Sequence, residues 1–468
     1  MFSVQRRGAA RLAAAALASG LVVAGSIAIA GPAAADESAT GTGGVTATLG
    51  DLKIFDDVVI KGKKDRTVSA GLFEMAVKPG GSIQTYCIDL YTGAKTGEEY
   101  KEVGWDQSSL HNNKDAGKIR WILQNSYPQV NDLDSLAKKA GASKLSKETA
   151  AAATQAAIWH FSDKVDAVPA DADAAKLTDF LEKSAVELSE PSASLSLSPS
   201  SVSGKAGGRL GPVTVETNAA TAKVSLAPGA PAGVKIVDKD GKVVTDVAKG
   251  SQVYFDVPAG TPDGSAELTV QADTTVPIGR AFVATRTTSQ TLILAGTSIS
   301  TASAKASATW VKQGAAPSVT AEKNCAKGGV DITLGNKGDE AWELELKGMK
   351  YTIPAGESKT VTVPVAEDAA YKFTITGPNG FEKVIEGVLD CKTATPGPTP
   401  SETPSGNPSP SQTPATGGTT SGSTTGGGDL AETGSSNATP MIAGIAVALL
   451  AVGGCAVFFL RKKKAAGQ

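Results

Sequence analysis

Short apolar runs recur along the chain between residues 192 and 392. Runs such as Val213–Val215, Leu292–Leu294 and Trp342–Leu346 are separated by Gly, Pro, Asp and Asn. Apolar residues at every second position are typical of strands with one buried face. The pattern therefore predicts two all-β units, a β-sandwich stalk domain at residues 191–315 and a smaller β domain at residues 316–392.

Residues 45–190 combine strand and helix signals. Residues 81–90 have the composition of a strand. Apolar residues at helical spacing predict three helices, at Asp115–Asn125, Thr149–Phe161 and Asp171–Leu188. Ser146 is the expected N-cap of the second helix. The expected fold class is mainly β, with an α+β N-terminal domain followed by two β-sandwich-like stalk domains.

The N-terminus has the parts of a secretory signal peptide. Arg6, Arg7 and Arg11 lead into an apolar stretch at Leu12–Ala30, and an A-x-A exit ends at Ala35. We therefore expect residues 1–35 to be removed on export. An amphipathic or buried helix is the alternative, and it fits these flanks poorly. Arg6 and Arg7 form only a weak twin-arginine signal, so the export route stays open between Sec and Tat.

The C-terminus carries a membrane segment and a sorting motif. An apolar run at residues 441–460 would span about 30 Å as a transmembrane helix, and residues 461–468 form a basic cytoplasmic tail. The preceding motif consists of Leu430, Ala431, Glu432, Thr433 and Gly434. In this order the parts resemble the sorting signals of Gram-positive wall-anchored proteins, in the LAxTG form of high-GC species. The resemblance implies that a sortase joins Thr433 to peptidoglycan; a plain single-pass anchor is the alternative.

Residues 393–429 consist almost entirely of Thr, Pro, Ser and Gly. Such a segment cannot bury apolar area, so we expect a disordered linker through the wall. The expected protein is secreted and anchored to the cell wall. It contacts the membrane only before sorting, and its binding function lies at the N-terminal end.

Charge and composition exclude several functions. The chain has 45 Lys and Arg against 47 Asp and Glu, a net charge of −2, so we expect no nucleic-acid partner. Only two histidines occur, His111 and His160, and there is no Cys-x-x-Cys motif, so we expect no His/Cys metal site. No phosphate-binding glycine pattern follows a predicted strand, and we expect no cofactor.

The four cysteines have different settings. Cys455 lies in the apolar tail. Cys325 and Cys391 bracket the small β domain and would form a disulfide in an oxidising exterior. Cys87 is left over in the predicted strand. It is a buried inert thiol, a disulfide partner of Cys325 or Cys391, or a reactive group.

Gln155 is the second unusual residue. At helical spacing it shares a face with Ile158 and Trp159, and a long polar side chain facing a core needs a partner. Attack of the Cys87 thiolate on the Gln155 carboxamide carbon would release ammonia and leave a thioester. An amine would convert that thioester to a stable amide. Burial beside Trp159 and Tyr86 would slow its hydrolysis.

The motif Tyr86-Cys87-Ile88-Asp89 followed by Thr154–Trp159 resembles the paired motifs of the Cys–Gln thioester domains (TQxA-type) of Gram-positive surface adhesins. The segment Gly117–Pro128 resembles the helix between them, and the resemblance covers about residues 45–190. It implies that Cys87 supplies the sulfur, Gln155 the acyl carbon and a target lysine the amine. The pocket residues expected around the bond are Tyr86, Asp89, Trp159 and His160. Such a protein binds once and is not an enzyme.

Two other functions stay open. A cysteine hydrolase would pair Cys87 with His160, which needs both within hydrogen-bond reach and an orienting third group. His160 lies about 140° around the helix from Gln155, which argues against that pairing. A passive wall or coat protein would carry no reactive chemistry. No pattern diagnostic of Lys–Asn or Lys–Asp isopeptide cross-links occurs in the stalk.

Overall fold

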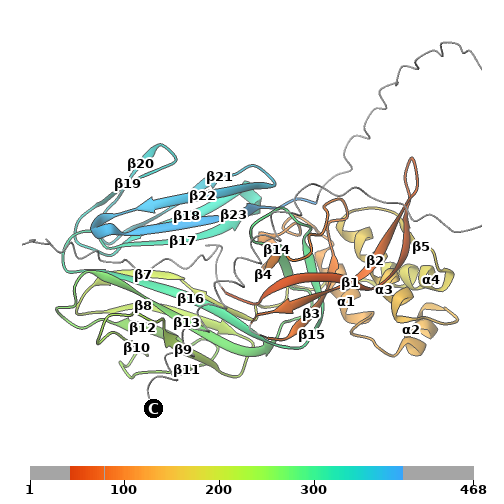
Figure 1. Cartoon of the computed structure of the whole chain (residues 1–468), viewed down its shortest axis with the longest axis horizontal. Coiled ribbons are helices and arrows are strands. Elements are labelled where there is room, and N and C mark those ends of the chain that lie inside the picture. The colour runs from red at the N-terminus through yellow and green to blue at the C-terminus, as the bar shows by residue number, and fades with distance from the viewer. Residues whose placement is uncertain (1–42, 79, 394–468) are drawn as a thin grey trace, which may run out of the picture. The chain divides into compact units, whose positions relative to one another are not determined.

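The computed structural model describes residues 43–78 and 80–393, which belong to one compact unit (residues 1–398). The predicted signal peptide, residues 394–429 of the predicted linker, the predicted sorting motif and the apolar C-terminal run lie outside the described residues. Within those described ranges, none of the helices combines the length and the apolar character needed to cross a bilayer. Strands dominate, in agreement with the mainly β expectation (Figure 1).

Six antiparallel strands close on themselves around the N-terminal core. In sheet order they are β2 (Arg66–Val77), β3 (Ser82–Cys87), β15 (Leu292–Thr297), β14 (Ala281–Ala284), β4 (Glu99–Val103) and β1 (Thr46–Ile60). β1 pairs with β2 as well as with β4, which closes the barrel. The short β5 (Ala167–Pro169) pairs with the far end of β1. Strand β3, which ends at Cys87, lies between β2 and β15 over most of its length.

Two barrel strands come from a distant part of the chain. The sequence pattern places Leu292–Leu294 in the β-sandwich of residues 191–315, but β15 pairs with β3, with Leu292 opposite Cys87. Residues 292–296 are all buried, because Leu292 and Leu294 belong to one apolar cluster and Ile293 and Ala295 to another. An apolar run buried on both faces does not reveal which sheet it joins. The N-terminal domain is thus discontinuous in sequence.

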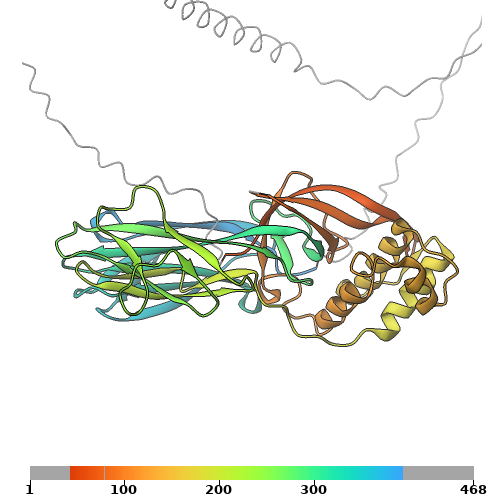
Figure 2. The same cartoon turned by 90° about the horizontal axis from the view of Figure 1, so that it is seen from below.

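Four helices gather on one side of the barrel (Figures 1 and 2). They are α1 (Ala116–Asn125), α2 (Leu133–Ala140), α3 (Lys147–Ser162) and α4 (Ala172–Ser184). Three of them match the predicted helices, and the predicted N-cap Ser146 starts α3 through a capping box with Thr149. Between Ala150 and Ser162 only His160 is exposed. Helix α3 is therefore the central element of the helical layer.

The second domain contains two sheets that share one apolar core. The first sheet contains β10 (Lys235–Val237), β12 (Gln252–Asp256), β8 (Arg209–Thr217) and β6 (Leu195–Ser198). The second contains β11 (Asp246–Val247), β9 (Ala222–Leu226), β13 (Gly264–Thr275), β16 (Ile299–Val311) and β7 (Ser201–Lys205). All neighbours are antiparallel except β16 and β7. This is the two-sheet architecture that the short alternating runs predict.

The small β domain has three paired regions. Its sheet contains β17 (Pro317–Asn324), β18 (Gly329–Asn336) and β21 (Ser358–Pro364). Its two hairpins are β19 (Trp342–Leu346) with β20 (Met349–Ile353), and β22 (Ala369–Thr376) with β23 (Glu382–Leu389). A disulfide joins Cys325, directly after β17, to Cys391, just beyond β23. This is the pairing that the sequence predicts.

A buried ion pair ties the barrel to the start of the second domain. Arg280 Nε lies 3.0 Å from Glu102 Oε1, and both side chains are less than a tenth exposed. The Glu102 carboxylate also accepts the backbone N–H groups of Val45 (3.1 Å) and Ser194 (3.0 Å). Arg280 Nη1 also lies 2.6 Å from Glu190 Oε1, so loss of Glu102 would leave Arg280 with one partner, whereas loss of Arg280 would leave the buried Glu102 carboxylate uncompensated.

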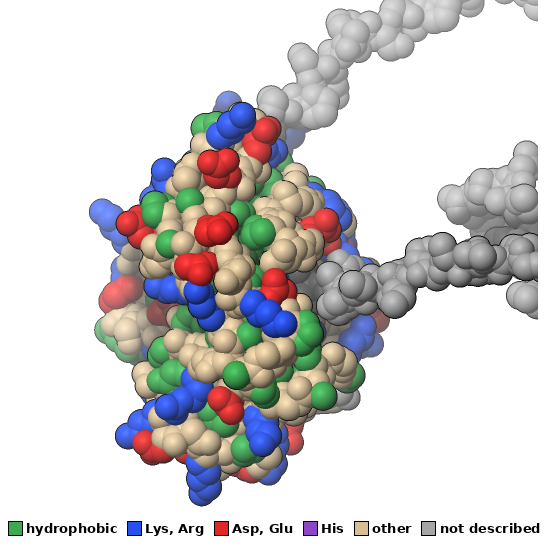
Figure 3. Space-filling view, turned by 90° about the vertical axis from the view of Figure 1, so that its left-hand side faces the viewer, with side chains coloured by type: hydrophobic (Ala, Val, Ile, Leu, Met, Phe, Trp, Pro, Cys, Tyr) green, Lys and Arg blue, Asp and Glu red, His purple; other side chains and the backbone are tan. Residues whose placement is uncertain are grey.

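Surface charges are mixed in sign. On the face shown in Figure 3, Lys and Arg side chains are interspersed with Asp and Glu. Exposed pairs such as Lys183–Asp179, at 2.8 Å, contribute little stability individually. A face of mixed sign produces no concentrated field for a polyanion.

Candidate functional site

At the end of strand β3, the backbone N–H and C=O of Cys87 do not pair with a neighbouring strand. Ile88 N–H donates to Thr291 O at 3.1 Å, so in the β3–β15 ladder the neighbouring pair Cys87–Leu292 is a non-hydrogen-bonded one. The N–H and C=O of Cys87 therefore point away from β15. On that other side, β2 pairs with β3 only as far as Phe73 opposite Thr85. Both backbone groups of Cys87 are left without a strand partner.

The Gln155 side chain takes the position of the missing strand. Cys87 N–H donates to Gln155 Oε1 at 2.9 Å, and Gln155 Nε2 donates to Cys87 O at 2.8 Å. Gln155 is fully buried, and Cys87 is a free cysteine that is 4% exposed. The carboxamide thus imitates a peptide group at the end of the ladder. The fold brings together two residues that lie 68 positions apart in sequence.

Helix α3 holds Gln155 in this position. Thr154 Oγ1 donates to Ala150 O at 2.7 Å and lies 2.7 Å from Ser126 Oγ, which follows α1. Ala152 and Ala156 belong to the same apolar cluster as Cys87. Their small side chains let the strand approach the helix closely. The run of alanines therefore has a packing function beyond its high helix propensity.

The charges around Cys87 are negative. Burial, followed by the charges of Asp163 and Asp89, raises the pKa of the Cys87 thiol well above its usual value. Asp89 is itself 1% exposed. The resting sulfur is therefore a neutral thiol, and a free thiolate would be costly at this position.

Asp163 is a site residue that the sequence motifs do not indicate. It forms the C-cap of α3, and its Oδ1 accepts Leu90 N–H at 2.8 Å. The turn after Cys87 is thereby attached to the helix that carries Gln155. Burial raises the pKa of Asp163 to about 6. One local feature of the sequence could have indicated Asp163. An acidic residue at a helix C-terminus interacts unfavourably with the helix dipole, and such unfavourable placements cluster at functional sites.

The other expected pocket residues are placed differently. Trp159 is 3% exposed and packs in the cluster that contains Cys87. Within the described ranges its indole N–H has no hydrogen-bond partner. Tyr86 points to the other face of β3, where its hydroxyl donates to Tyr127 O at 2.8 Å, and burial raises its pKa. It therefore supports the strand without sharing the cluster of Cys87.

His160 faces away from the Cys87–Gln155 pair. Its side chain is 47% exposed, and its Nδ1 lies 3.8 Å from Glu182 Oε1 on α4. Burial lowers the pKa of His160 and raises that of Glu182 to about 7. Both shifts favour the neutral forms, so the contact is not a strong ion pair. His160 is not positioned as a base for Cys87.

The comparisons with known proteins agree with this geometry. Residues 84–187 match the thioester domain family, and both Cys87 and Gln155 lie inside the match. This part of the chain is therefore a thioester domain. Domains of this class attach covalently to their targets, as in surface adhesins. Residues 317–388, from β17 to β23, match the C-terminal domain of bacterial phospholipase C.

Solved structures give weaker likenesses. The Bacillus anthracis TIE protein is 15% identical, with 75% of this chain and 81% of that chain covered and a TM-score of 0.27. The thioester domain of the Enterococcus faecium TIE86 protein is 19% identical, with 57% and 97% covered and a TM-score of 0.27. The E. coli chaperone DraB is 11% identical, with 42% and 97% covered and a TM-score of 0.17. No curated protein matches the chain.

Proposed function

We propose that this protein is a wall-anchored adhesin that attaches to amine-bearing targets through a thioester between Cys87 Sγ and Gln155 Cδ. The pair of reciprocal hydrogen bonds, at 2.9 and 2.8 Å, carries the proposal. These bonds hold the acyl carbon against the backbone of the nucleophilic residue in a buried site. Reacting groups held in this way need little further ordering before they react.

Thioester formation is balanced without a cofactor. Cys87 Sγ bonds to Gln155 Cδ, the Cδ–Nε2 bond breaks, and the thiol proton leaves with the nitrogen as part of one ammonia. Cys87 N–H already donates to Gln155 Oε1, the atom on which negative charge develops in the tetrahedral intermediate. A fixed donor at that atom stabilises the intermediate.

In the reaction with the target, the amine is the nucleophile and the Cys87 sulfur is the leaving group. The amine nitrogen attacks Cδ, an amide forms, and the sulfur leaves as a thiol. Because burial raises the pKa of the Cys87 thiol, the sulfur needs a proton as it departs. The attacking amine loses one proton in the same step, which balances the reaction. The amide is stable, so each chain attaches once, to a lysine of a surface protein or an equivalent amine.

Anchoring forms the second part of the proposal. The signal peptide at residues 1–35 would direct export, and a sortase would join Thr433 to peptidoglycan. The linker at residues 393–429 would then hold the thioester domain beyond the wall. Wall fragments released by a muramidase should end at Thr433 linked to a peptidoglycan stem peptide. Protein released with residues 434–468 still attached would contradict the sortase step.

Intact mass tests the thioester. After two hydrogens are subtracted for the Cys325–Cys391 disulfide, the mature chain, residues 36–433, should weigh one ammonia less than its sequence, whereas Cys87→Ala should show no such deficit. Methylamine should add to Gln155 in the wild type alone and should expose one thiol. The shorter fragment 36–190 is unsuitable because it lacks the barrel strands β14 and β15. A full starting mass together with no methylamine adduct would remove the thioester and leave a passive wall protein.

The hydrolase alternative has its own test. It would need His160 beside Cys87, but His160 is oriented toward Glu182. We expect His160→Ala to leave the methylamine adduct yield unchanged. A large loss of yield in a folded His160→Ala variant would make His160 a base in the attack of the amine. Labelling of Cys87 by a thiol reagent before any amine treatment would support the hydrolase.

A further inference from the structure

Three carboxylates lie together beside the disulfide of the small β domain. Glu367 and Asp368 precede β22, and Asp390 directly follows β23. One carboxylate oxygen of each residue lies within 4.8 Å of the others. Asp368 N–H donates to Leu389 O at 2.8 Å, which holds the loop against the end of the strand. Tertiary structure therefore fixes a set of like charges at short range.

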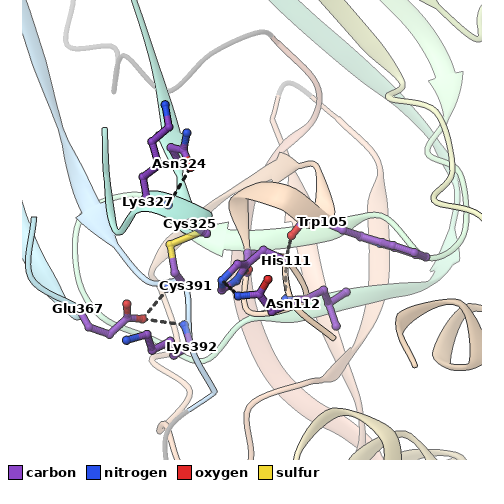
Figure 4. Close-up of a disulfide and its surroundings, with 11 residues drawn as sticks. Trp105, His111, Asn112, Asn324, Cys325, Lys327, Glu367, Cys391 and Lys392 are labelled. Carbon is purple, nitrogen blue, oxygen red and sulfur yellow. Dashed lines mark hydrogen bonds between the residues drawn. A yellow bond between two sulfur atoms is a disulfide. The ribbon is translucent and has the colours of Figure 1, made fainter. Parts of the chain in front are cut away.

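Glu367 has a fixed orientation. Its Oε1 accepts the backbone N–H of Cys391 at 2.6 Å and that of Lys392 at 2.7 Å (Figure 4). Cys391 is held in turn by its disulfide to Cys325. Neither hydrogen bond uses Oε2, so this oxygen can serve as a ligand atom at no cost to the loop.

Asp390 provides the observation that points to a ligand. It is 5% exposed, and its buried Oδ1 has no hydrogen-bond partner within the described part of the chain. Burial, followed by the charge of Asp89, raises the pKa of Asp390 to about 7, and only Lys323 opposes this shift. Leaving a buried carboxylate oxygen without a donor is costly. The surrounding protein therefore satisfies Asp390 incompletely.

The net charge of the cluster favours a cation. The three carboxylates carry three negative charges when all are ionised, and of the outside charges that act on Asp390, the Asp89 carboxylate adds one negative charge and the buried Lys323 ammonium offsets one. All candidate ligand atoms are oxygens, which suit hard cations, and exposure rises from Asp390 through Glu367 to Asp368. We propose that Glu367, Asp368 and Asp390 bind one Ca²⁺. Calcium tolerates the irregular geometry of ligands from two segments better than magnesium does.

A cation at this site would strengthen a contact between two domains. Thr288, between the barrel strands β14 and β15, donates its hydroxyl to Asp368 O at 3.2 Å. Ordering of Asp368 by Ca²⁺ would therefore also order the segment that leads into β15, the neighbour of β3. The proposal stands independently of the thioester.

Titration of the mature chain tests the site. Metal is removed with EDTA, and CaCl₂ or MgCl₂ is added in separate calorimetric titrations and thermal melts. We expect one Ca²⁺ site with a Kd on the order of 10⁻⁴ to 10⁻³ M, a Tm that rises with Ca²⁺, and a weaker response to Mg²⁺. Asp390→Asn and Asp368→Asn should each weaken Ca²⁺ binding about tenfold or more. Glu343→Gln, exposed on β19, is the matched control and should bind like the wild type.

Several results would overturn the proposal. These are the absence of saturable Ca²⁺ binding by the wild type, or unchanged binding by a folded Asp368→Asn variant. Asp368 is exposed, so this variant tests the site even if Asp390→Asn does not fold. An intact mass that is lower by one water, with Lys323 and Asp390 found in one cross-linked peptide, would also overturn the proposal. Such a result would mean that an amide joins the two side chains and that Asp390 has no carboxylate left to bind a cation. The ammonia deficit of the same samples reports the thioester separately.

Discussion

Gln155→Glu tests whether the carboxamide completes the ladder at Cys87. The substitution replaces Nε2, which donates to Cys87 O at 2.8 Å, with a carboxyl oxygen. Oε1 still accepts Cys87 N–H. The change preserves size and leaves one acceptor in place. It therefore reports the hydrogen bond to the Cys87 carbonyl and little else.

The expected effect depends on pH. Only the protonated form of the introduced carboxyl can donate to Cys87 O, and the site is fully buried. Its pKa in the folded protein should therefore lie above the unfolded value of about 4.3. Its stabilising contribution is complete below pH of about 4 and is lost as the pH rises through the folded pKa. A shift of about 2–3 units corresponds to a loss of about 3–4 kcal/mol at neutral pH.

Urea unfolding of two proteins measures this loss. Both carry Cys87→Ala, which prevents the covalent bond and keeps the backbone groups of residue 87, and one also carries Gln155→Glu. Their difference in unfolding free energy should be about 1 kcal/mol at pH 5 and about 3–4 kcal/mol at pH 7.5. Groups such as Asp163 titrate in both proteins and cancel. If the two proteins differ in unfolding free energy by the same amount at pH 5 and pH 7.5, the proposed hydrogen bond from Gln155 Nε2 to Cys87 O is refuted.

Three further predictions concern stability. Burial raises the pKa of Asp163 to about 6, so its protonated form stabilises the fold below about pH 4 and this contribution is lost as the pH rises through 6. Asp163→Asn keeps an acceptor without the charge, and urea unfolding should show a gain of about 1–3 kcal/mol at pH 7.5 that vanishes near pH 4. Replacing both Cys325 and Cys391 with Ala should cost about 4 kcal/mol in the same assay, given their separation of 66 residues. Arg280→Met should cost about 3–5 kcal/mol because it leaves the buried Glu102 charge unpaired. Adding Glu102→Gln, which removes that charge and keeps a side-chain oxygen as an acceptor, should restore part of the loss, whereas additive losses would contradict a coupled pair.

Local patterns predict the elements that carry the site. The capping signal at Ser146 starts α3, and the helical spacing of Gln155 and Trp159 places both on a buried face. Residues 81–90 predict the strand that ends at Cys87. These features depend on neighbours within a few positions. Propensity, capping and side-chain periodicity are read directly from such a window.

Long-range pairing could not be predicted in the same way. The run Leu292–Leu294 fits any buried strand, and only the closure of the barrel places it beside β3. Asp163 enters the site through one hydrogen bond to Leu90, and neither residue belongs to a motif. The carboxylates before β22 and after β23 meet only after that hairpin has formed.

The sequence alone therefore determined which residues could react: an unpaired cysteine in a strand, a glutamine on the inner face of an alanine-rich helix, and a disulfide pair around a small domain. The tertiary structure decided where β2 diverges from β3, and hence that the Gln155 carboxamide rather than another strand meets the backbone of Cys87. The physical reason is the distance in sequence between the residues that interact. Helix and strand signals depend on residues that are near neighbours in sequence, whereas strand pairing and burial depend on residues far apart. Bringing distant residues together costs chain entropy, and only burial of apolar surface in the assembled core offsets that cost.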